Sequence, residues 1–330
     1  MTHTSNRWSN LALLLITLPA ISACSSTQEK DPRLLDDPRL QDVEVTGGEA
    51  TPYSRDPLKD NRRIGFILAE IDRKVGIWAN LVLRGDPAKD TSTLTQVESS
   101  IRYEASKHAS GLVEQLETGP PRNRKIAATA LGFVESKKET ASPLGPLLAA
   151  LDDSDDEVIA NALLGLSILA DPKTPLTRIA GMLQDRERDA AARNNAGRVL
   201  RAMPTEVLRG SEKDAVLRAA RFSVGDEDSR VRIHGLMILA QMEDSESLSD
   251  MASLLGDENR LVQLAASRAV AYVGEADSQS LGNAARALQA ARRNSKSKGL
   301  RSAVLDDLRR LTQRNFDSED EWLEYVNQLN

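Results

Sequence analysis

The chain has 330 residues and a formal net charge of −6, with 43 Lys and Arg residues against 49 Asp and Glu residues. Nucleic acid is disfavoured as a partner, because most affinity for nucleic acid comes from basic side chains that neutralise phosphates. The sequence contains one cysteine, which excludes an internal disulfide and a closed zinc site built from thiolates.

Residues 1–23 have the pattern of a cleaved secretory signal peptide. A short polar start with Arg7 precedes an apolar run from Leu11 to Ala20 and then small residues. This run is shorter than the roughly 20 residues that a membrane-spanning helix needs. A membrane-spanning helix is therefore the weaker interpretation.

Residues 21–24, with the sequence ISAC, resemble the bacterial lipobox, in which an aliphatic and two small residues precede a cysteine. The resemblance implies cleavage before Cys24 and lipidation of its thiol and amine, so that acyl chains anchor the protein to a membrane. The alternative is a buried or nucleophilic thiol. Ser25 stands where enterobacterial lipoproteins retained at the inner membrane have Asp, which favours the periplasmic face of the outer membrane.

Residues 24–60 are predicted to be the lipidated cysteine and a disordered tether. The segment is rich in Asp, Pro, Gly and Arg and contains two consecutive hexapeptides, DPRLLD and DPRLQD. We interpret the duplication as solvated linker, with a docking motif for a partner as the alternative.

Residues 61–90 are predicted to form an N-terminal capping helix, and a second helix is expected from about Thr91 to Glu117. The apolar face of the first comprises Ile64, Ile67, Leu68, Ile71, Val75, Trp78, Leu81 and Val82. This face is expected to cover a helical core, because the acidic residues Glu70 and Asp72 favour a protein neighbour over a membrane surface. The alternative is a helix lying on a membrane, with Arg62, Arg63, Arg73 and Lys74 near headgroups.

A repeated pattern of apolar and small residues decides the predicted architecture. Six copies follow the same order, in which one helix ends, a polar turn follows and a second helix carries an Ala or Gly at the middle of its apolar stripe. The successive turn positions are Thr118, Asp153, Asp185, Asp226 and Asp257, which lie 31 to 41 residues apart. We expect each turn aspartate to accept hydrogen bonds from the N–H groups at the start of the second helix.

The stretches LLAALDDSDDEVIANALLGLSILAD and MASLLGDENRLVQLAASRAVAYVGE resemble HEAT repeats, including the HEAT-like repeats of the phycobilisome lyase group. The resemblance implies an all-α fold, a right-handed α-solenoid of about six helix pairs, with the repeats over residues 91–314. Residues 315–330 are predicted to form a C-terminal capping helix that covers the last layer with Trp322, Leu323, Val326 and Leu329.

No catalytic or cofactor-binding motif accompanies the repeats, and we expect no enzyme activity, cofactor or metal. The acidic run Asp152 to Glu157 departs from a calcium-binding loop and is better explained by helix capping. His234 is expected to be a partly buried, hydrogen-bonded histidine, with a ligand or base as the alternative. Ser295 and Lys298 are interpreted as part of a solvated basic turn.

Arginines in the second helices are the candidate partner-binding residues. They are Arg124, Arg193, Arg198, Arg232, Arg268, Arg301 and Arg309. Four of them, Arg124, Arg193, Arg232 and Arg301, directly follow the first stripe position. The resemblance to HEAT proteins implies an internal ladder to the turn aspartates of neighbouring repeats at this position. The alternative is that the arginines line the inner face and bind acidic groups of a protein partner.

Together these features predict an extracytoplasmic lipoprotein whose solenoid serves as a protein-interaction scaffold or assembly factor at the cell envelope. The alternative is a lyase, a transferase-like enzyme or a chaperone on the same scaffold. A deep cleft that brings titratable groups together would favour the enzyme, and a shallow polar groove would favour the scaffold.

Overall fold

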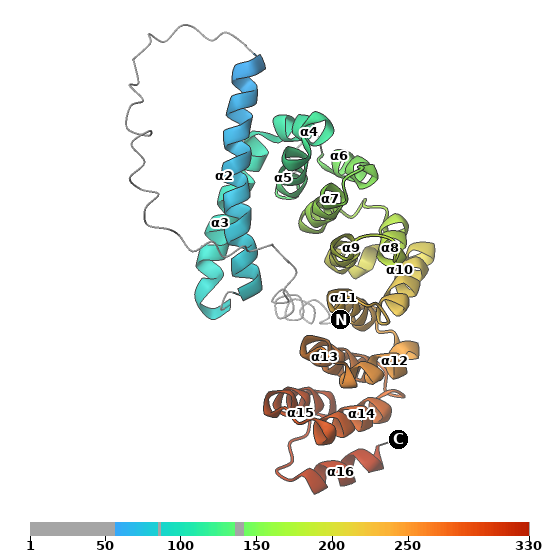
Figure 1. The fold of residues 1–330 in the computed structure, drawn as a ribbon. Helices are drawn as coiled ribbons and strands as arrows, with labels where there is room; N and C mark the ends of the chain where they lie inside the picture. Colours follow the sequence, from blue (N-terminus) through green and yellow to red (C-terminus); the bar gives the residue numbers. More distant parts are fainter. Residues whose placement is uncertain (1–56, 85–86, 136–141, 330) are drawn as a thin grey trace, which may run out of the picture.

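The computed structural model describes residues 57–84, 87–135 and 142–329, and over these residues the chain is helical without a β-strand (Figure 1). The predicted signal peptide (1–23), Cys24 and the predicted tether up to residue 56 lie outside the described residues. The first described helix, α2 (Pro57–Arg84), takes in the last four residues assigned to the tether. Within the described part of the chain, no helix is long and apolar enough to cross a membrane.

Six consecutive helix pairs make up the described repeats, and each coincides with one predicted copy. The pairs are α4 (Ala109–Thr118) with α5 (Pro121–Leu131), α6 (Leu144–Ala149) with α7 (Asp156–Leu169), α8 (Leu176–Gln184) with α9 (Ala190–Ala202), α10 (Gly210–Ser223) with α11 (Ser229–Gln241), α12 (Leu248–Ser253) with α13 (Arg260–Ala276), and α14 (Leu281–Asn294) with α15 (Lys298–Thr312).

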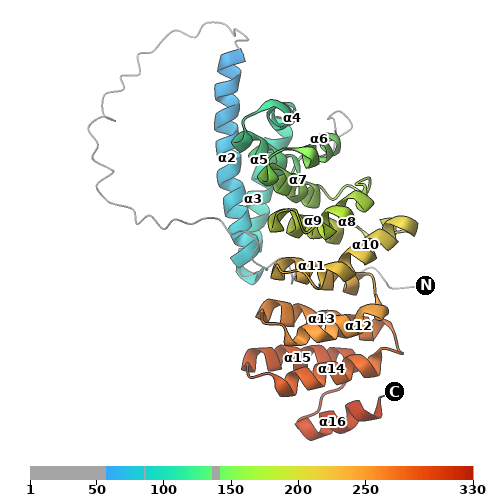
Figure 2. The ribbon, with the colours of Figure 1, turned by 45° about the vertical axis from the view of Figure 1, so that its right-hand side comes forward.

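The pairs stack into an arc, with one layer of helices on its inner side and one on its outer side (Figures 1 and 2). Each second helix packs on the second helix of the next pair, from α5 through to α15, and these helices form the inner layer. The first helices form the outer layer. The predicted α-solenoid is confirmed.

Small residues at the centre of the second helices allow the inner layer to pack closely. The middle stripe residues Ala127, Ala162, Ala196 and Ala266 are fully buried. A Cβ atom added to Gly165 would lie within 3.0 Å of the carbonyl oxygen of Ala128, so α5 and α7 approach backbone to backbone. Leu, Val and Ile side chains fill the remaining volume of one continuous core.

The prediction that the turn aspartates cap the second helices was wrong, because the cap lies two residues after Asp153, Asp226 and Asp257 and four residues after Asp185. The side chains that accept a helix N–H are those of Asp155, Asp189, Asp228 and Asn259. The turn residues Asp153, Asp226 and Asp257 instead accept the N–H of the capping residues Asp155, Asp228 and Asn259, at 2.9, 2.8 and 2.7 Å. Each of these turn aspartates stabilises the turn by accepting this amide N–H, and its carboxylate is directed toward the preceding repeat.

The helix expected over residues 91–117 is in fact two helices, α3 (Pro87–Lys107) and α4. His108 separates them, with φ −115° and ψ 20°, outside the helical region. The break allows α3 to pack on α2 while α4 packs on α5, which one straight helix could not do. The capping helix predicted over residues 61–90 likewise ends at Arg84.

Helix α2 lies on the inner side of the arc against α5 (Figures 1 and 2). Leu68 and Ile71 are buried, and the ring of Trp78 meets that of Phe133 edge to face, with 5.4 Å between centroids. The indole N–H of Trp78 donates to Glu98 of α3 at 2.9 Å. The apolar face of α2 therefore has a protein neighbour, as the first interpretation of the sequence expected.

The other end of the solenoid is covered by α16 (Glu319–Gln328), which packs on α14. Ser318 begins the helix with a capping box that Glu321 completes. Trp322 and Val326 are buried, whereas Leu323 and Leu329 are half-buried. The ring of Phe316 packs edge to face on Trp322, with 4.9 Å between centroids.

Candidate functional site

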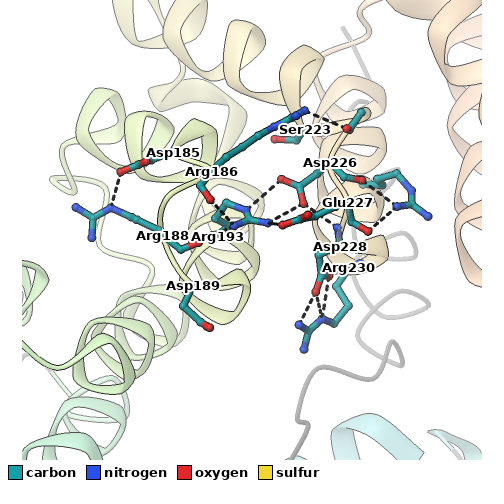
Figure 3. A network of polar contacts seen from close by, with 12 residues as sticks. Asp185, Arg186, Arg188, Asp189, Arg193, Ser223, Asp226, Glu227, Asp228 and Arg230 are labelled. Carbon is teal, nitrogen blue, oxygen red and sulfur yellow. Dashed lines mark hydrogen bonds and ion pairs between the residues drawn. The ribbon is translucent and has the colours of Figure 1, made fainter.

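Three of the seven candidate arginines form an internal ladder between repeats. The guanidinium of Arg124 donates to both carboxylate oxygens of Asp153, at 2.8 and 2.9 Å, and that of Arg193 to both oxygens of Asp226, at 3.1 and 3.0 Å. Arg232 donates to Asp257 at 2.9 Å. Figure 3 shows the second of these contacts, with Arg193 of α9 facing Asp226 in the turn before α11.

Each ladder arginine also binds the turn of its own repeat. Arg124 donates to the carbonyl of Gly119, Arg193 to that of Arg188 and Arg232 to that of Asp226. Gln263 and Arg301 occupy the same position in the last two pairs and donate to the carbonyls of Asp257 and Ser295. This side chain therefore ties the turn to the second helix even where no aspartate faces it.

The ladder carboxylate of Asp153 is stabilised in its charged form. Burial opposes the charge of Asp153, but the hydrogen bonds and positive charge of Arg124, together with the Asp155 amide, outweigh it and lower the pKa of Asp153. The second ladder pair is the most deeply buried, with Arg193 2% and Asp226 3% exposed. The contacts of Arg124, Arg193 and Arg232 are thus those of the internal ladder.

Two further candidates, Arg268 and Arg309, face acids on α15. The Nε atom of Arg268 lies 2.8 Å from Asp307, one repeat further on, and Arg309 lies 3.4 Å from Asp306 on its own helix. Asp307 is buried and also accepts a hydrogen bond from Ser267 at 2.7 Å. Arg268 and Asp307 form a second link between neighbouring repeats.

Arg198 is the candidate for which the described residues provide neither an ion pair nor a hydrogen bond, and its Nε atom is buried. Arg301 also lacks an acidic partner but donates to the carbonyl of Ser295. Arg201, three residues later on α9, has no acidic partner in the described chain either, and donates to Nδ1 of His234 at 3.3 Å. Sequence reasoning missed Arg201, although its spacing from Arg198 puts both side chains on one face of a helix.

His234 of α11 is held neutral by its surroundings. Burial, and then the charges of Arg201, Arg198 and Arg230, lower the pKa of His234 well below its usual range. Because Nδ1 accepts from Arg201, the ring proton is assigned to Nε2. The prediction of a buried, hydrogen-bonded histidine is confirmed.

A groove of about 540 Å³ lies beside Arg198, between α2 and the inner layer. Helix α2 forms one side, with Val75, Trp78, Ala79 and Val82, and the opposite side comes from α7, α9 and α11. Arg198 and Arg230 line the groove on that side, together with the carboxylates Asp156, Glu157 and Asp189. The groove is thus apolar along α2 and charged along the solenoid.

The groove lining includes no Ser, Thr, Tyr, Cys, His or Lys side chain. One of its aspartates serves the backbone, since Asp189 accepts the N–H of Ala191 at 2.7 Å. In the described part of the chain, no three His, Cys, Asp or Glu residues gather where a metal ion could bind. The groove can hold a ligand by charge and apolar contact.

No protein-family model matches the sequence, and no curated protein matches it. Among solved structures, an engineered protein of the Northeast Structural Genomics Consortium aligns with a TM-score of 0.50 and 19% identity, over 62% of this chain and 98% of its own. A designed armadillo repeat protein aligns with a TM-score of 0.47 and 18% identity, over 61% of this chain and 98% of its own. At 19% identity the first of these likenesses shows the fold alone, a helical repeat solenoid.

Proposed function

We propose that this protein is a membrane-anchored, extracytoplasmic HEAT-repeat lipoprotein that acts as a protein-interaction scaffold or assembly factor at the cell envelope. The observation that carries the proposal is the groove on the inner side of the arc, which combines an apolar wall on α2 with an arginine that lacks an internal partner. Inner faces of solenoids are extended surfaces suited to holding another protein.

The anchoring part of the proposal rests on the sequence. Residues 1–23 have the pattern of a signal peptide, and the lipobox resemblance places the lipidated residue at Cys24. With Ser25 next to it, the expected location is the periplasmic face of the outer membrane.

Binding without turnover fits the groove better than catalysis does. An acyl-transfer or lyase reaction needs a nucleophile or a general base close to the reacting atoms. Two of the groove carboxylates are already bound, Asp189 to the amide of Ala191 and Glu157 to Lys125. Burial, and then the charges of Arg201, Arg198 and Arg230, lower the pKa of His234 and make it a weak base. These features favour the scaffold over the enzyme.

The anchor is tested by fractionation of cells that express the wild-type chain or Cys24→Ala. We expect the wild type in the washed membrane pellet and the variant in the soluble envelope fraction or as uncleaved precursor. Retention of processed Cys24→Ala protein in the pellet at the wild-type level would refute lipid anchoring.

The scaffold is tested by site-specific photocrosslinking in cells. A photoreactive residue replaces Leu164 or Ala191, which line the groove, and Lys213, which is exposed on outer helix α10, serves as the matched control. We expect discrete protein adducts from the groove positions and none from the control. Adducts of equal yield from both faces, or none from the groove, would contradict a scaffold that uses its inner side.

A further inference from the structure

Two positive charges on α9 lack an internal counterion. Neither Arg198 nor Arg201 has an acidic partner among the described residues, the two lie one turn apart on the same helix, and Arg198 also lies close to Arg230. Like charges at this spacing repel each other. The contrast with Arg193 on the same helix, which has two acidic partners, shows that the fold supplies partners where it uses an arginine structurally.

Three carboxylates in or beside the groove are already engaged. Asp228 binds Arg230 through several hydrogen bonds, the shortest 2.6 Å, Asp189 caps α9, and Glu157 pairs with Lys125. Burial, and then the charge of Arg230, lowers the pKa of Arg198. Burial, and then the charge of Arg198, lowers the pKa of Arg201 to about 10. Both guanidinium groups would therefore gain from an anion supplied by another molecule.

The charge of the surroundings selects the kind of anion. Asp156, Glu157 and Asp189 line the same groove as Arg198, so a dianionic phosphate would meet repulsion that a single carboxylate largely escapes. Val75, Trp78, Ala79 and Val82 line the opposite side and suit an apolar side chain next to the carboxylate. A volume of about 540 Å³ is within the range of pockets that hold several side chains.

We propose that the groove binds an extended segment of the partner protein that places a single carboxylate side chain on Arg198, supported by Arg201, and a neighbouring apolar side chain against α2. The proposal rests on the proposed scaffold function and names the chemistry of its partner. Guanidinium groups bind carboxylates through two parallel hydrogen bonds, which gives the site both affinity and orientation.

Binding is measured with the full chain in detergent and a fluorescent, end-blocked pentapeptide, Ser-Leu-Asp-Leu-Ser, by anisotropy. We expect Arg198→Gln to raise the Kd about tenfold or more, because a charge-assisted pair is lost. Arg218→Gln, on the exposed side of α10, should leave the Kd unchanged. Peptides with Asn or phosphoserine in place of Asp should bind more weakly than the Asp peptide.

Stability gives a second readout that does not depend on the peptide. Because Arg198 has no acidic partner in the described chain, Arg198→Met should unfold at or above the wild-type temperature. A lower melting temperature for Arg198→Met, an unchanged Kd for Arg198→Gln, or tighter binding of the phosphoserine peptide would each overturn the proposal. If the Asp peptide fails to bind while groove crosslinks persist, this proposal fails and the scaffold stands. If the crosslinks are also missing, both fail.

Discussion

Replacement of Arg193 by Met tests whether the arginine ladder stabilises the stacking of repeats. Arg193 is 2% exposed and Asp226 3% exposed, so the substitution leaves a buried carboxylate without its cation. Removing one partner of a buried ion pair costs about 3–5 kcal/mol of unfolding free energy. We expect Arg193→Met to lose about 3 kcal/mol of unfolding free energy, the lower end of this range, because Asp226 keeps the hydrogen bond from the Asp228 amide at 2.8 Å.

The measurement is urea unfolding of the full chain in detergent, followed by far-ultraviolet circular dichroism. Hydrogen exchange at the amides of α9 and α11 locates the effect, because repeats can open locally. The matched control is Arg301→Met, at the same repeat position, whose guanidinium is exposed and donates to the carbonyl of Ser295. The unfolding free energy of this control should lie within about 0.5 kcal/mol of that of the wild type.

The double variant Arg193→Met with Asp226→Asn should recover part of the loss, since it removes the unpaired charge and keeps an acceptor for the turn amide. If Arg193→Met costs no more than Arg301→Met, or if the double variant is as unstable as the sum of its parts, the ladder does not stabilise the stack in this way.

Two further predictions concern His234 and the close approach of α5 and α7. His234 stays neutral in the folded state while the unfolded chain takes up a proton near pH 6.5, so the wild type should lose stability as pH falls. The free energy of unfolding of the wild type should differ between pH 7.5 and about pH 5, and His234→Gln should remove up to about 2 kcal/mol of that difference. Equal dependence of unfolding free energy on pH in the wild type and the variant would contradict a neutral His234. Gly165→Ala should lower stability by about 1–3 kcal/mol through its contact with the Ala128 carbonyl. Gly181→Ala, in a helical position with open space, should raise it by about 0.5–1 kcal/mol, and thermal melts of both should therefore shift in opposite directions.

The six helix pairs could be predicted from the sequence because their stripes repeat. Each stripe places Leu, Val and Ala at helical spacing, and burial of these residues needs no partner beyond the adjacent layer. The capping role could not be assigned in the same way. Asp153 and Asp155 are both suited to cap α7, and the backbone conformation of the turn decides between them.

The partners of the arginines were also beyond the sequence alone. Arg193 and Arg198 lie on one helix, yet five residues turn the side chain by about 140°, so that one faces the next turn and the other the groove. The apolar face of α2 was visible, whereas its position on the inner side of the arc depends on Trp78 and Phe133, which are far apart in the chain. The break at His108 follows from the different neighbours of α3 and α4.

The position of α2 gives the groove a mechanical asymmetry. One wall belongs to the stacked repeats, which the arginine ladder braces, and the other is a single helix that begins at Pro57. Tension applied to the chain ahead of Pro57 is transmitted to this helix before it reaches the rest of the arc. A load from that end would therefore change the width of the groove sooner than the curvature of the solenoid.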